Sequence, residues 1–361
     1  MAITQQSPRP ERVFWTGNEA VAWAAVAAGA EIMCGYPITP QNEIMHTWVR
    51  LAHQYGLDFL QTEDELSAGF ATLGGVLAGK VAFTATAGPG TVLMQEPLSM
   101  AEMMRLPVVV VVCQRGGPST GTVIYSQQEV MLACFGGNGE GLRVVYAPAT
   151  HQELYDYTIK AFRVAWKYRF PTIVLSDGYQ AKMREALTVY RVEDQVRGEA
   201  YVGRPGVPGV ARPPAHLRNT YNLEEELYDL LANYTTAFQE IQPRVGEWQE
   251  EDWQGAELLV VAHGVVTRAA RAAVRELRGE GYPVGYFRPV TLRPFPAEVL
   301  RRWASLGGTM LVVESAAGQL RRLVAEALAG YGFRLEGLLR PGVGITPEEI
   351  VAVARGLLAA N

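Results

Sequence analysis

The sequence contains only three cysteines in 361 residues, and no two of them form a Cys-x-x-Cys pair. An iron–sulfur cluster held by four thiolates of this chain alone is therefore excluded. Cys34, Cys113 and Cys134 lie in widely spaced apolar stretches, so we expect buried hydrophobic side chains rather than a disulfide framework. The five histidines show no spacing typical of metal ligands, and we predict no metal site in this chain.

Long hydrophobic runs and an excess of positive charge are also missing. The longest apolar run, residues 106–113, contains a proline, whereas a membrane-spanning helix needs about 20 residues. Residues 1–11 are polar and lack the apolar core of a secretory signal, which favours a cytoplasmic location. A net charge of -5 argues against a nucleic-acid partner. We expect neither membrane nor nucleic acid as a partner.

The first half of the chain alternates between short β-branched runs and helical periodicity. The expected strands are apolar throughout, which is typical of a parallel sheet covered by helices on both faces. We therefore predict a doubly wound α/β domain over residues 1–195. The expected strands are 32–36, 58–62, 81–86, 108–113, 144–146 and 172–176, and the expected helices are 19–28, 41–55, 66–77, 93–104, 127–135 and 151–168.

Residues 196–255 interrupt this alternation, and a second one follows. Proline and glycine cluster between 203 and 214, and apolar residues at spacings of three and four from 223 to 241 predict an amphipathic helix, which we expect to lie against a partner surface. We interpret 196–255 as a connector and 256–361 as a second α/β domain. Its 13 arginines and 9 glutamates, without Lys or Asp, indicate either a charged docking face or a solvated surface.

Three loops that follow expected strands carry candidate functional residues, because ligands bind beyond the carboxyl ends of such strands. In the first, residues 35–40, Thr39 suits a helix N-cap and Pro40 the first helical position, so an anion could dock at the helix end. Thr39 could equally be only a cap.

The second loop carries three consecutive acids, Glu63, Asp64 and Glu65. Consecutive helical positions do not share a face, so at most one of them points into a site. An acid in a first helical turn can serve only to complement the helix dipole. Small residues over 67–75, however, let another body approach closely. A carboxylate in such apolar surroundings suits proton transfer, because burial favours its protonated form.

The third loop, residues 115–121, begins with Arg115 at the end of a buried strand. A buried guanidinium needs an anion, which is either a ligand carboxylate or an acid elsewhere in the chain. Two other segments carry weaker signals. Residues 84–90 lack the lysine of a phosphate-binding loop, so we interpret them as a tight turn, and Asp177-Gly178 lacks the asparagine of a magnesium–diphosphate motif.

Together these segments resemble the α subunit of 2-oxoacid:ferredoxin oxidoreductases, closest to the 2-oxoglutarate and branched-chain members. The resemblance covers about the first 190 residues. The second domain is similar to transketolase C-terminal domains through residues 291–296 and through Glu314 with Gly318-Gln319. The segments of the first domain that carry the resemblance are 17–20, 35–40, 63–65, 84–90, 93–96, 115–121, 167–168 and 176–179.

The resemblance implies a thiamine-diphosphate-binding fold whose first domain takes the aminopyrimidine half of the cofactor. A separate β subunit would hold the diphosphate, Mg²⁺ and a [4Fe-4S] cluster. Glu65 would be the catalytic residue, bonded to the pyrimidine ring nitrogen, and Thr39 and Arg115 would bind the 2-oxoacid carboxylate. Further cofactor contacts would come from Pro37, Ile38, Gly88 and Pro89, and further substrate contacts from Tyr36, Ser119, Thr120 and Asn138.

The implied reaction is the oxidative decarboxylation of a 2-oxoacid, in which coenzyme A takes the acyl group and ferredoxin the electrons. Further γ and ferredoxin-like δ subunits are compatible with it. Asn138 stands where the family commonly has a histidine, and residues 122–125 also depart from the family pattern. A 2-oxoglutarate-like substrate is favoured. The alternatives are a non-redox thiamine-dependent lyase or transketolase-like half-enzyme, and a non-catalytic subunit that retains the fold.

Overall fold

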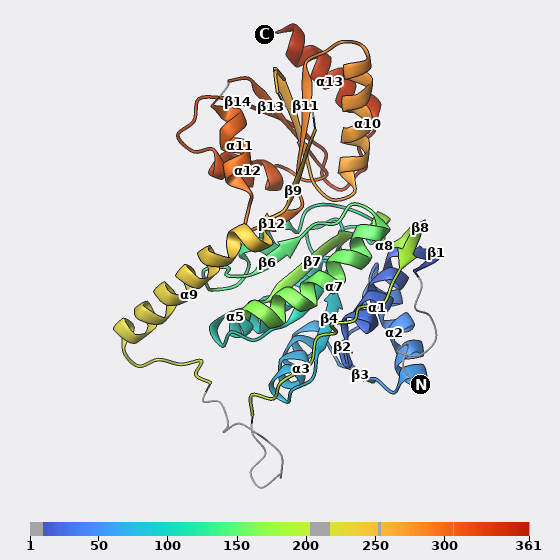
Figure 1. Cartoon of the computed structure of the whole chain (residues 1–361), viewed down its shortest axis with the longest axis vertical. Helices are drawn as coiled ribbons and strands as arrows, with labels where there is room; N and C mark the ends of the chain where they lie inside the picture. Colours follow the sequence, from blue (N-terminus) through green and yellow to red (C-terminus); the bar gives the residue numbers. More distant parts are fainter. Residues whose placement is uncertain (1–9, 203–216, 252–253, 306, 361) are drawn as a thin grey trace.

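The structure, a computed structural model, describes residues 10–202, 217–251, 254–305 and 307–360. Its first domain is built on a seven-stranded sheet in the order β12-β6-β7-β5-β4-β2-β3 (Figure 1). All neighbours are parallel except β12, and β4 to β7 are buried along their whole length, as the apolar runs predict. The strands are β2 (Ile32–Gly35), β3 (Asp58–Gln61), β4 (Ala82–Thr86), β5 (Val109–Gln114), β6 (Val144–Tyr146), β7 (Thr172–Asp177) and β12 (Thr291–Arg293).

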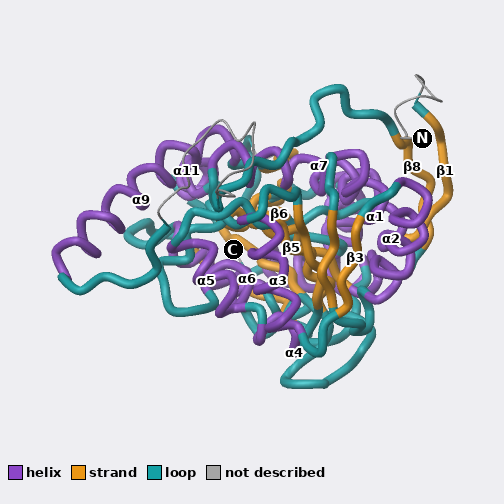
Figure 2. Tube along the Cα trace, turned by 90° about the horizontal axis from the view of Figure 1, so that it is seen from below, coloured by secondary structure: helices purple, strands orange, loops and turns teal. Residues whose placement is uncertain are grey.

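Helices cover both faces of this sheet, which confirms the doubly wound fold (Figure 2). One face is covered by α1 (Gly17–Ala28), α2 (Asn42–Tyr55) and α7 (His151–Tyr168), and the other by α3 (Glu65–Leu77), α5 (Gln95–Met103) and α6 (Val130–Phe135). A short helix that was not expected, α4 (Pro89–Leu93), precedes α5, which corresponds to the helix expected over 93–104. The expected buried cysteines are confirmed, since all three are free and buried. Among the described residues, no helix is long and apolar enough to cross a bilayer.

The second domain has the five-stranded sheet β14-β13-β10-β11-β9. Helices α10 and α13 pack on one face, and α11 and α12 on the other (Figure 1). The strands are β9 (Trp248–Glu251), β10 (Leu258–Ala262), β11 (Val284–Pro289), β13 (Thr309–Glu314) and β14 (Arg334–Leu339), and the helices are α10 (Val266–Gly279), α11 (Ala297–Ala304), α12 (Gln319–Ala327) and α13 (Pro347–Ala359). A two-stranded sheet of β1 (Glu11–Thr16) and β8 (Arg184–Val189), together with α8 (Gly178–Lys182), completes the first domain.

The amphipathic helix of the connector is confirmed as α9 (Glu224–Val245). Its partner, however, is this chain: Phe238, Ile241 and Val245 pack on the first domain around Phe170. Its first half projects from the body, where Tyr228 is 73% exposed (Figure 1). The proline- and glycine-rich cluster expected between 203 and 214 lies outside the described residues, and the domain boundaries at 195 and 255 stay a prediction.

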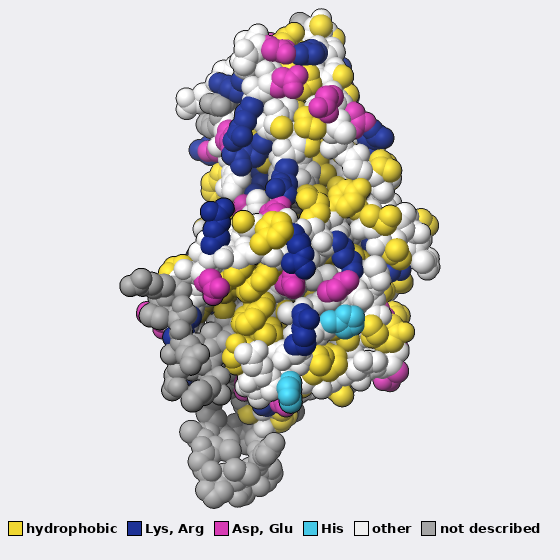
Figure 3. All heavy atoms as spheres, turned by 90° about the vertical axis from the view of Figure 1, so that its right-hand side faces the viewer, with side chains coloured by type: hydrophobic (Ala, Val, Ile, Leu, Met, Phe, Trp, Pro, Cys, Tyr) yellow, Lys and Arg dark blue, Asp and Glu magenta, His cyan; other side chains and the backbone are white. Residues whose placement is uncertain are grey.

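The arginines of the second domain are interspersed with acidic side chains on its surface (Figure 3). Arg355 lies close to Glu276 and Glu280, and Arg271 pairs with Glu251. Exposed pairs of this kind contribute little to stability. They favour the solvated-surface interpretation over a docking face.

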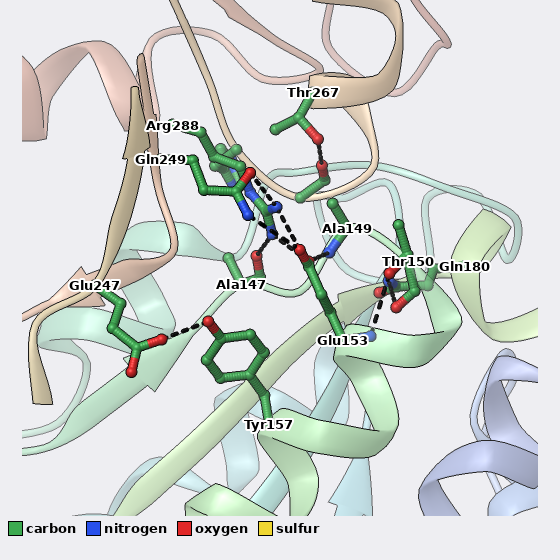
Figure 4. Close-up of polar contacts among 12 residues, drawn as sticks. Ala147, Ala149, Thr150, Glu153, Tyr157, Gln180, Glu247, Gln249, Thr267 and Arg288 are labelled. Carbon is green, nitrogen blue, oxygen red and sulfur yellow. Dashed lines mark hydrogen bonds and ion pairs between the residues drawn. The ribbon is translucent and has the colours of Figure 1, made fainter. Parts of the chain in front are cut away.

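A buried ion pair fixes the second domain on the first (Figure 4). Arg288 of β11 is 2% exposed and donates from Nη1 and Nη2 to the two carboxylate oxygens of Glu153 on α7, at 2.8 and 2.5 Å. Its Nη2 also donates to the carbonyl of Ala147 at 3.0 Å. Burial opposes ionisation of Glu153, but the bonds and charge of Arg288 lower the pKa of that carboxyl. Breaking such a pair leaves a buried charge, so the domain arrangement is strongly constrained.

Candidate active site

Four candidate loops meet at one edge of the first sheet. They follow β3, β2, β4 and β5, which are consecutive neighbours in the sheet. The chain leaves β2 for β3 on one side and returns to β4 on the other, so the order of the strands reverses between β2 and β4. Loops at such a reversal separate and leave room for a ligand at the carboxyl ends of the strands. The topology therefore brings together loops that are up to 80 residues apart in sequence.

Glu65 is the one acid of its trio that points inward. Asp64 caps α3 by accepting a hydrogen bond from the Ser67 backbone N–H at 2.7 Å, and Glu63 accepts one from the Ser67 hydroxyl at 2.9 Å. Glu65, the first residue of α3, is 5% exposed, and its Oε1 has no hydrogen-bond partner among the described residues. Burial raises the pKa of the Glu65 carboxyl and the charge of Asp64 adds to this, whereas a backbone hydrogen bond and Arg115 oppose it.

Helix α4 approaches the Glu65 carboxylate more closely than any side chain there would allow. A Cβ added at Gly90 would lie 2.4 Å from Glu65 Oε1 and 2.3 Å from Thr86 Oγ1. The Thr86 hydroxyl is buried and also lacks a partner in the described chain. An unpartnered carboxylate oxygen and hydroxyl side by side cost free energy unless a polar ligand pairs with them.

Arg115 is buried at the end of β5 and lies across the β4–α4 turn. A Cβ at Gly88 would lie 2.6 Å from Arg115 Nε, so glycine is needed for this approach, and the φ of +54° there also favours glycine. Arg115 Nη1 donates to the carbonyl of Thr39 at 2.8 Å, and its Nε is unpartnered. No acid of the described chain forms an ion pair with it. The guanidinium therefore keeps donor capacity for a ligand anion.

Glu129 is a functional candidate that sequence reasoning missed. Its Oε1 accepts from the backbone N–H of Arg115 at 3.0 Å and of Gly88 at 2.9 Å, and its Oε2 accepts from the Thr91 hydroxyl at 2.6 Å. Burial raises the pKa of this carboxyl, and these three bonds oppose the shift. Glu129 thus joins the ends of β4 and β5. The only signal in the sequence is an acid directly before an apolar run.

The loop after β2 departs from expectation at the start of its helix. Thr39 is not the N-cap of α2, because backbone N–H groups of Gln41 and Asn42 both return to the carbonyl of Ile38, and this turn delays the helix to Asn42. The side chain of Gln41 instead binds the carbonyl of Tyr36 at 2.9 Å. The expected N-cap at Thr39, with Pro40 at the first helical position, is therefore wrong, whereas the anion site expected in this loop stays a prediction. Thr39 reaches the site through its carbonyl.

The remaining candidates are those in the loops after β2 and β4, which lie near Glu65 and Arg115 in the chain fold, and three exposed residues in other loops. Pro89 begins α4 and lies beside Gly88 in a turn, which confirms the tight-turn interpretation. Tyr36 and Ile38 are half-buried and Pro37 is exposed in the loop after β2.

Ser119, Thr120 and Asn138 are exposed, and none of their side chains contacts Glu65 or Arg115 through a hydrogen bond in the described chain. Asn138 lies over α5, where its backbone N–H meets Ser99 Oγ at 3.4 Å.

The outer edge of the site carries exposed apolar side chains. Two cavities, of about 560 and 460 Å³, lie elsewhere, and neither includes Glu65 or Arg115. Apolar side chains beside Glu65 face outward: Phe70 of α3 is 38% exposed, and Val92 and Leu93 of α4 are 59% and 43% exposed. An edge of this kind suits a second polypeptide, because large apolar side chains gathered on a surface mark interaction sites.

Comparison with known protein families matches both domains. The family described as "Pyruvate flavodoxin/ferredoxin oxidoreductase, thiamine diP-bdg" matches residues 23–241. The family described as "Pyruvate:ferredoxin oxidoreductase core domain II" matches residues 256–345. The first match contains every candidate residue of the site.

Two relatives are similar to this chain over most of their length. A "2-oxoglutarate synthase subunit KorA" of Archaeoglobus fulgidus is 35% identical over 350 residues, which cover 95% of this chain and 98% of the relative. A "Ketoisovalerate oxidoreductase subunit VorB" of Methanothermobacter marburgensis is 36% identical over 320 residues, which cover 86% of this chain and 88% of the relative.

Solved structures agree with the fold. A "2-oxoglutarate:ferredoxin oxidoreductase from Magnetococcus marinus with 2-oxoglutarate, coenzyme A and succinyl-CoA bound" matches with a TM-score of 0.85 and 27% identity, and the match covers 96% of this chain but only 65% of that one. A "Split gene transketolase, inactive beta4 tetramer" matches with a TM-score of 0.59 and 17% identity over 95% of this chain and 98% of that one, which supports the fold alone.

Proposed function

This chain belongs to the 2-oxoacid:ferredoxin oxidoreductase family as an α subunit, and from that membership we propose that it carries the proton-handling half of an active site completed by a β-type subunit. The complete enzyme would convert a 2-oxoacid and coenzyme A to an acyl-CoA and CO₂ and pass the electrons to ferredoxin. The observation that carries the proposal is Glu65, a buried carboxyl with an unpartnered Oε1 at the open edge of the matched domain.

The residues around Glu65 fit the aminopyrimidine ring of thiamine diphosphate. The ring offers nitrogen atoms that can pair with the orphaned Glu65 Oε1 and the Thr86 hydroxyl. Gly88, Pro89 and Gly90 form a turn without bulky side chains, so a flat ring can approach the backbone, and Pro37 and Ile38 would contact the cofactor from the loop after β2. When bound, thiamine diphosphate supplies the nucleophile and electron sink that decarboxylation requires.

The chain's own residues would perform two tasks in this reaction. Because burial raises the pKa of Glu65, its carboxyl can hold a proton at Oε1 closer to neutral pH than an exposed glutamate and can share it with the ring nitrogen. Arg115 would bind the substrate carboxylate through the donors that Thr39 does not use. Tyr36, Thr39, Ser119, Thr120 and Asn138 would complete the substrate pocket.

We propose a 2-oxoglutarate-like substrate, and the relatives named above support it without deciding it. A subunit of a 2-oxoglutarate synthase and one of a ketoisovalerate oxidoreductase are 35% and 36% identical to this chain, over 95% and 86% of its length. The two substrates differ in whether a second carboxylate must be bound. Direct comparison of kcat/KM for 2-oxoglutarate and 2-oxoisovalerate therefore assigns the substrate class.

We assign the metal and cluster sites of the complete enzyme to the partner subunit, because the described residues offer no ligands for them. Within those residues no group of three or more His, Cys, Asp or Glu side chains could hold a metal ion. We propose that a β-type subunit supplies the sites for the diphosphate, Mg²⁺ and a [4Fe-4S] cluster, and that γ and δ subunits are optional additions. It would cover the apolar edge formed by Phe70, Val92 and Leu93.

The test is co-expression with a β-type subunit of this family. We expect oxoacid- and CoA-dependent reduction of a viologen dye by the complex and none by either chain alone. Glu65→Gln should lower turnover by orders of magnitude, on the order of 10²-fold or more, with assembly intact. Glu63→Gln is the matched control, because that acid is exposed two residues away. Full turnover by Glu65→Gln, or by this chain alone, would refute the proposal.

A further inference from the structure

Two polar residues of the segment 256–361 hold the loops of the first domain that carry the substrate candidates, and one of them lies in β12, which joins the sheet of the first domain. They are Arg293, at the end of β12, and Gln319, at the start of α12. We propose that Arg293 and Gln319 are positioning residues through which the second domain sets the shape of the 2-oxoacid pocket and hence its selectivity. The inference rests on the proposed function and assigns that site a further determinant.

Gln319 binds the loop after β5 with both ends of its amide. Its Nε2 donates to the carbonyl of Gln128 at 2.6 Å, and its Oε1 accepts from the backbone N–H of Met131 at 2.9 Å. Its own backbone is held in turn, because the buried Glu314 accepts from the next two N–H groups, those of Leu320 and Arg321, at 2.8 and 3.0 Å. Gln319 therefore fixes the position of residues 128–131 relative to the start of α12.

Gln127, which precedes this segment, is also hydrogen-bonded to the second domain. The side chain of Gln127 accepts from the Ser315 backbone N–H at 3.0 Å and donates to the carbonyl of His263 at 2.8 Å, and the Gln127 N–H donates to the Ser315 carbonyl at 3.0 Å. Glu129 lies between these anchored residues and holds the backbone of Arg115. The position of Arg115 is therefore coupled to the second domain through Glu129.

Arg293 holds the other substrate loop, residues 136–141. Its Nε donates to the carbonyl of Gly141 at 2.8 Å and its Nη2 to that of Glu140 at 2.9 Å, while the guanidinium lies 4.4 Å from the centre of the Phe135 ring. The opposite end of the loop is fixed by the buried Arg143, which donates to the carbonyl of Gly136 at 2.7 Å. Asn138 lies between these two anchors.

The consequence concerns substrate fit more than proton transfer. Ser119, Thr120 and Asn138 form no side-chain hydrogen bonds in the described chain, so their placement depends on how their loops are anchored. Glu65, in contrast, lies on α3 beside α4 and has no hydrogen bond to the described residues of the second domain. Loss of the anchoring hydrogen bonds of Gln319 or of Arg293 should therefore raise KM for the 2-oxoacid and change the selectivity between 2-oxoacids, with a smaller effect on kcat.

Each test variant removes the anchoring hydrogen bonds of a side chain and keeps the size of that side chain nearly unchanged. Gln319→Met deletes both hydrogen bonds with a side chain of similar size, and Arg293→Lys keeps the cation but cannot serve both carbonyls from a fork. Arg275→Ala is the control, because Arg275 is exposed on α10, on the other face of the second sheet, and its side chain has no hydrogen bond or ion pair in the described chain. All variants are assayed in the complex with the β-type subunit.

The first readout is hydrogen–deuterium exchange of the complex, which requires no substrate. We expect faster exchange confined to residues 116–131 in Gln319→Met and to residues 136–142 in Arg293→Lys. The second readout is kinetics with 2-oxoglutarate and 2-oxoisovalerate. We expect KM to rise about tenfold, kcat to change less than threefold and the ratio of the two kcat/KM values to shift, since each lost bond is worth about a factor of ten.

Two outcomes overturn the inference. One is exchange and selectivity equal to the control. The other is faster exchange across the whole chain with an equal fall of kcat for both substrates, which would indicate only a structural role. If the wild-type complex turned over no 2-oxoacid, the proposed function would fail, whereas local exchange in the variants would still show the anchoring of the loops. The two failures are therefore distinguishable.

Discussion

Gly90→Ala should separate activity from stability at the candidate site. The new methyl group would lie 2.4 Å from Glu65 Oε1 and 2.3 Å from Thr86 Oγ1, well inside van der Waals contact. The Glu65 carboxylate is the end of a flexible side chain and can move away, so we expect a loss of stability of only about 1–3 kcal/mol, typical of overpacking. A displacement of about 1 Å at a catalytic group, however, costs on the order of 10²-fold in rate.

Gly356→Ala is the matched control, because Gly356 lies in α13 of the second domain and a Cβ there meets nothing within 4 Å. Alanine in a helix should stabilise the chain by about 0.5–1 kcal/mol and leave turnover unchanged. The assay combines dye reduction by the reconstituted complex with thermal unfolding of each variant. Wild-type kcat in Gly90→Ala would show that the Glu65 carboxylate does not need its observed position, and the proton-transfer argument would fail.

Two further predictions concern charge. Arg115→Lys loses the guanidinium fork that binds the Thr39 carbonyl, so KM for the 2-oxoacid should rise roughly 10- to 100-fold in steady-state kinetics; an unchanged KM would place the substrate carboxylate elsewhere. Burial raises the pKa of Asp177 to about 7. The folded chain therefore binds the proton of this carboxyl more tightly than the unfolded chain does. As a result, the free energy of unfolding should fall by up to about 4 kcal/mol as the pH rises from about 4 to about 7. Asp177→Asn keeps an acceptor for the N–H groups of Tyr179 and Gln180 and should be more stable than wild type at pH 8 but not at pH 4 in thermal unfolding; parallel curves for the two proteins would contradict this.

Most of the first domain follows from local patterns in the sequence. The apolar strands and the small-residue helix were predictable, because burial on both faces leaves no polar alternation along β4, β5 and β7. The choice of one inward acid among three was predictable from helix geometry, although the resemblance was needed to select Glu65. Arg115 was identifiable because a charge at the end of a buried strand requires a partner.

What the sequence did not indicate depends on contacts between distant segments. Glu129 resembles any acid before a helix, and its role depends on N–H groups of Gly88 and Arg115 that only the fold brings to it. The predicted N-cap at Thr39 was wrong because the backbone N–H groups of Gln41 and Asn42 bind the carbonyl of Ile38. The turn that these bonds form replaces a helix cap at Thr39. Strands β1, β8, β9, β12 and β14 were missed because they are short or partly exposed and their pairing is non-local.

The pairing of β12 with β6 has a consequence for any attempt to dissect the chain. Strand β6 has β7 on one side, and β12 supplies its other neighbour from beyond residue 290. A fragment that stops before β12 would present the N–H and C=O groups of β6 to solvent along a hydrophobic strand, which is a template for association with other chains. Such a fragment should aggregate, and its failure to remain monomeric would reflect a missing strand rather than an unstable catalytic domain.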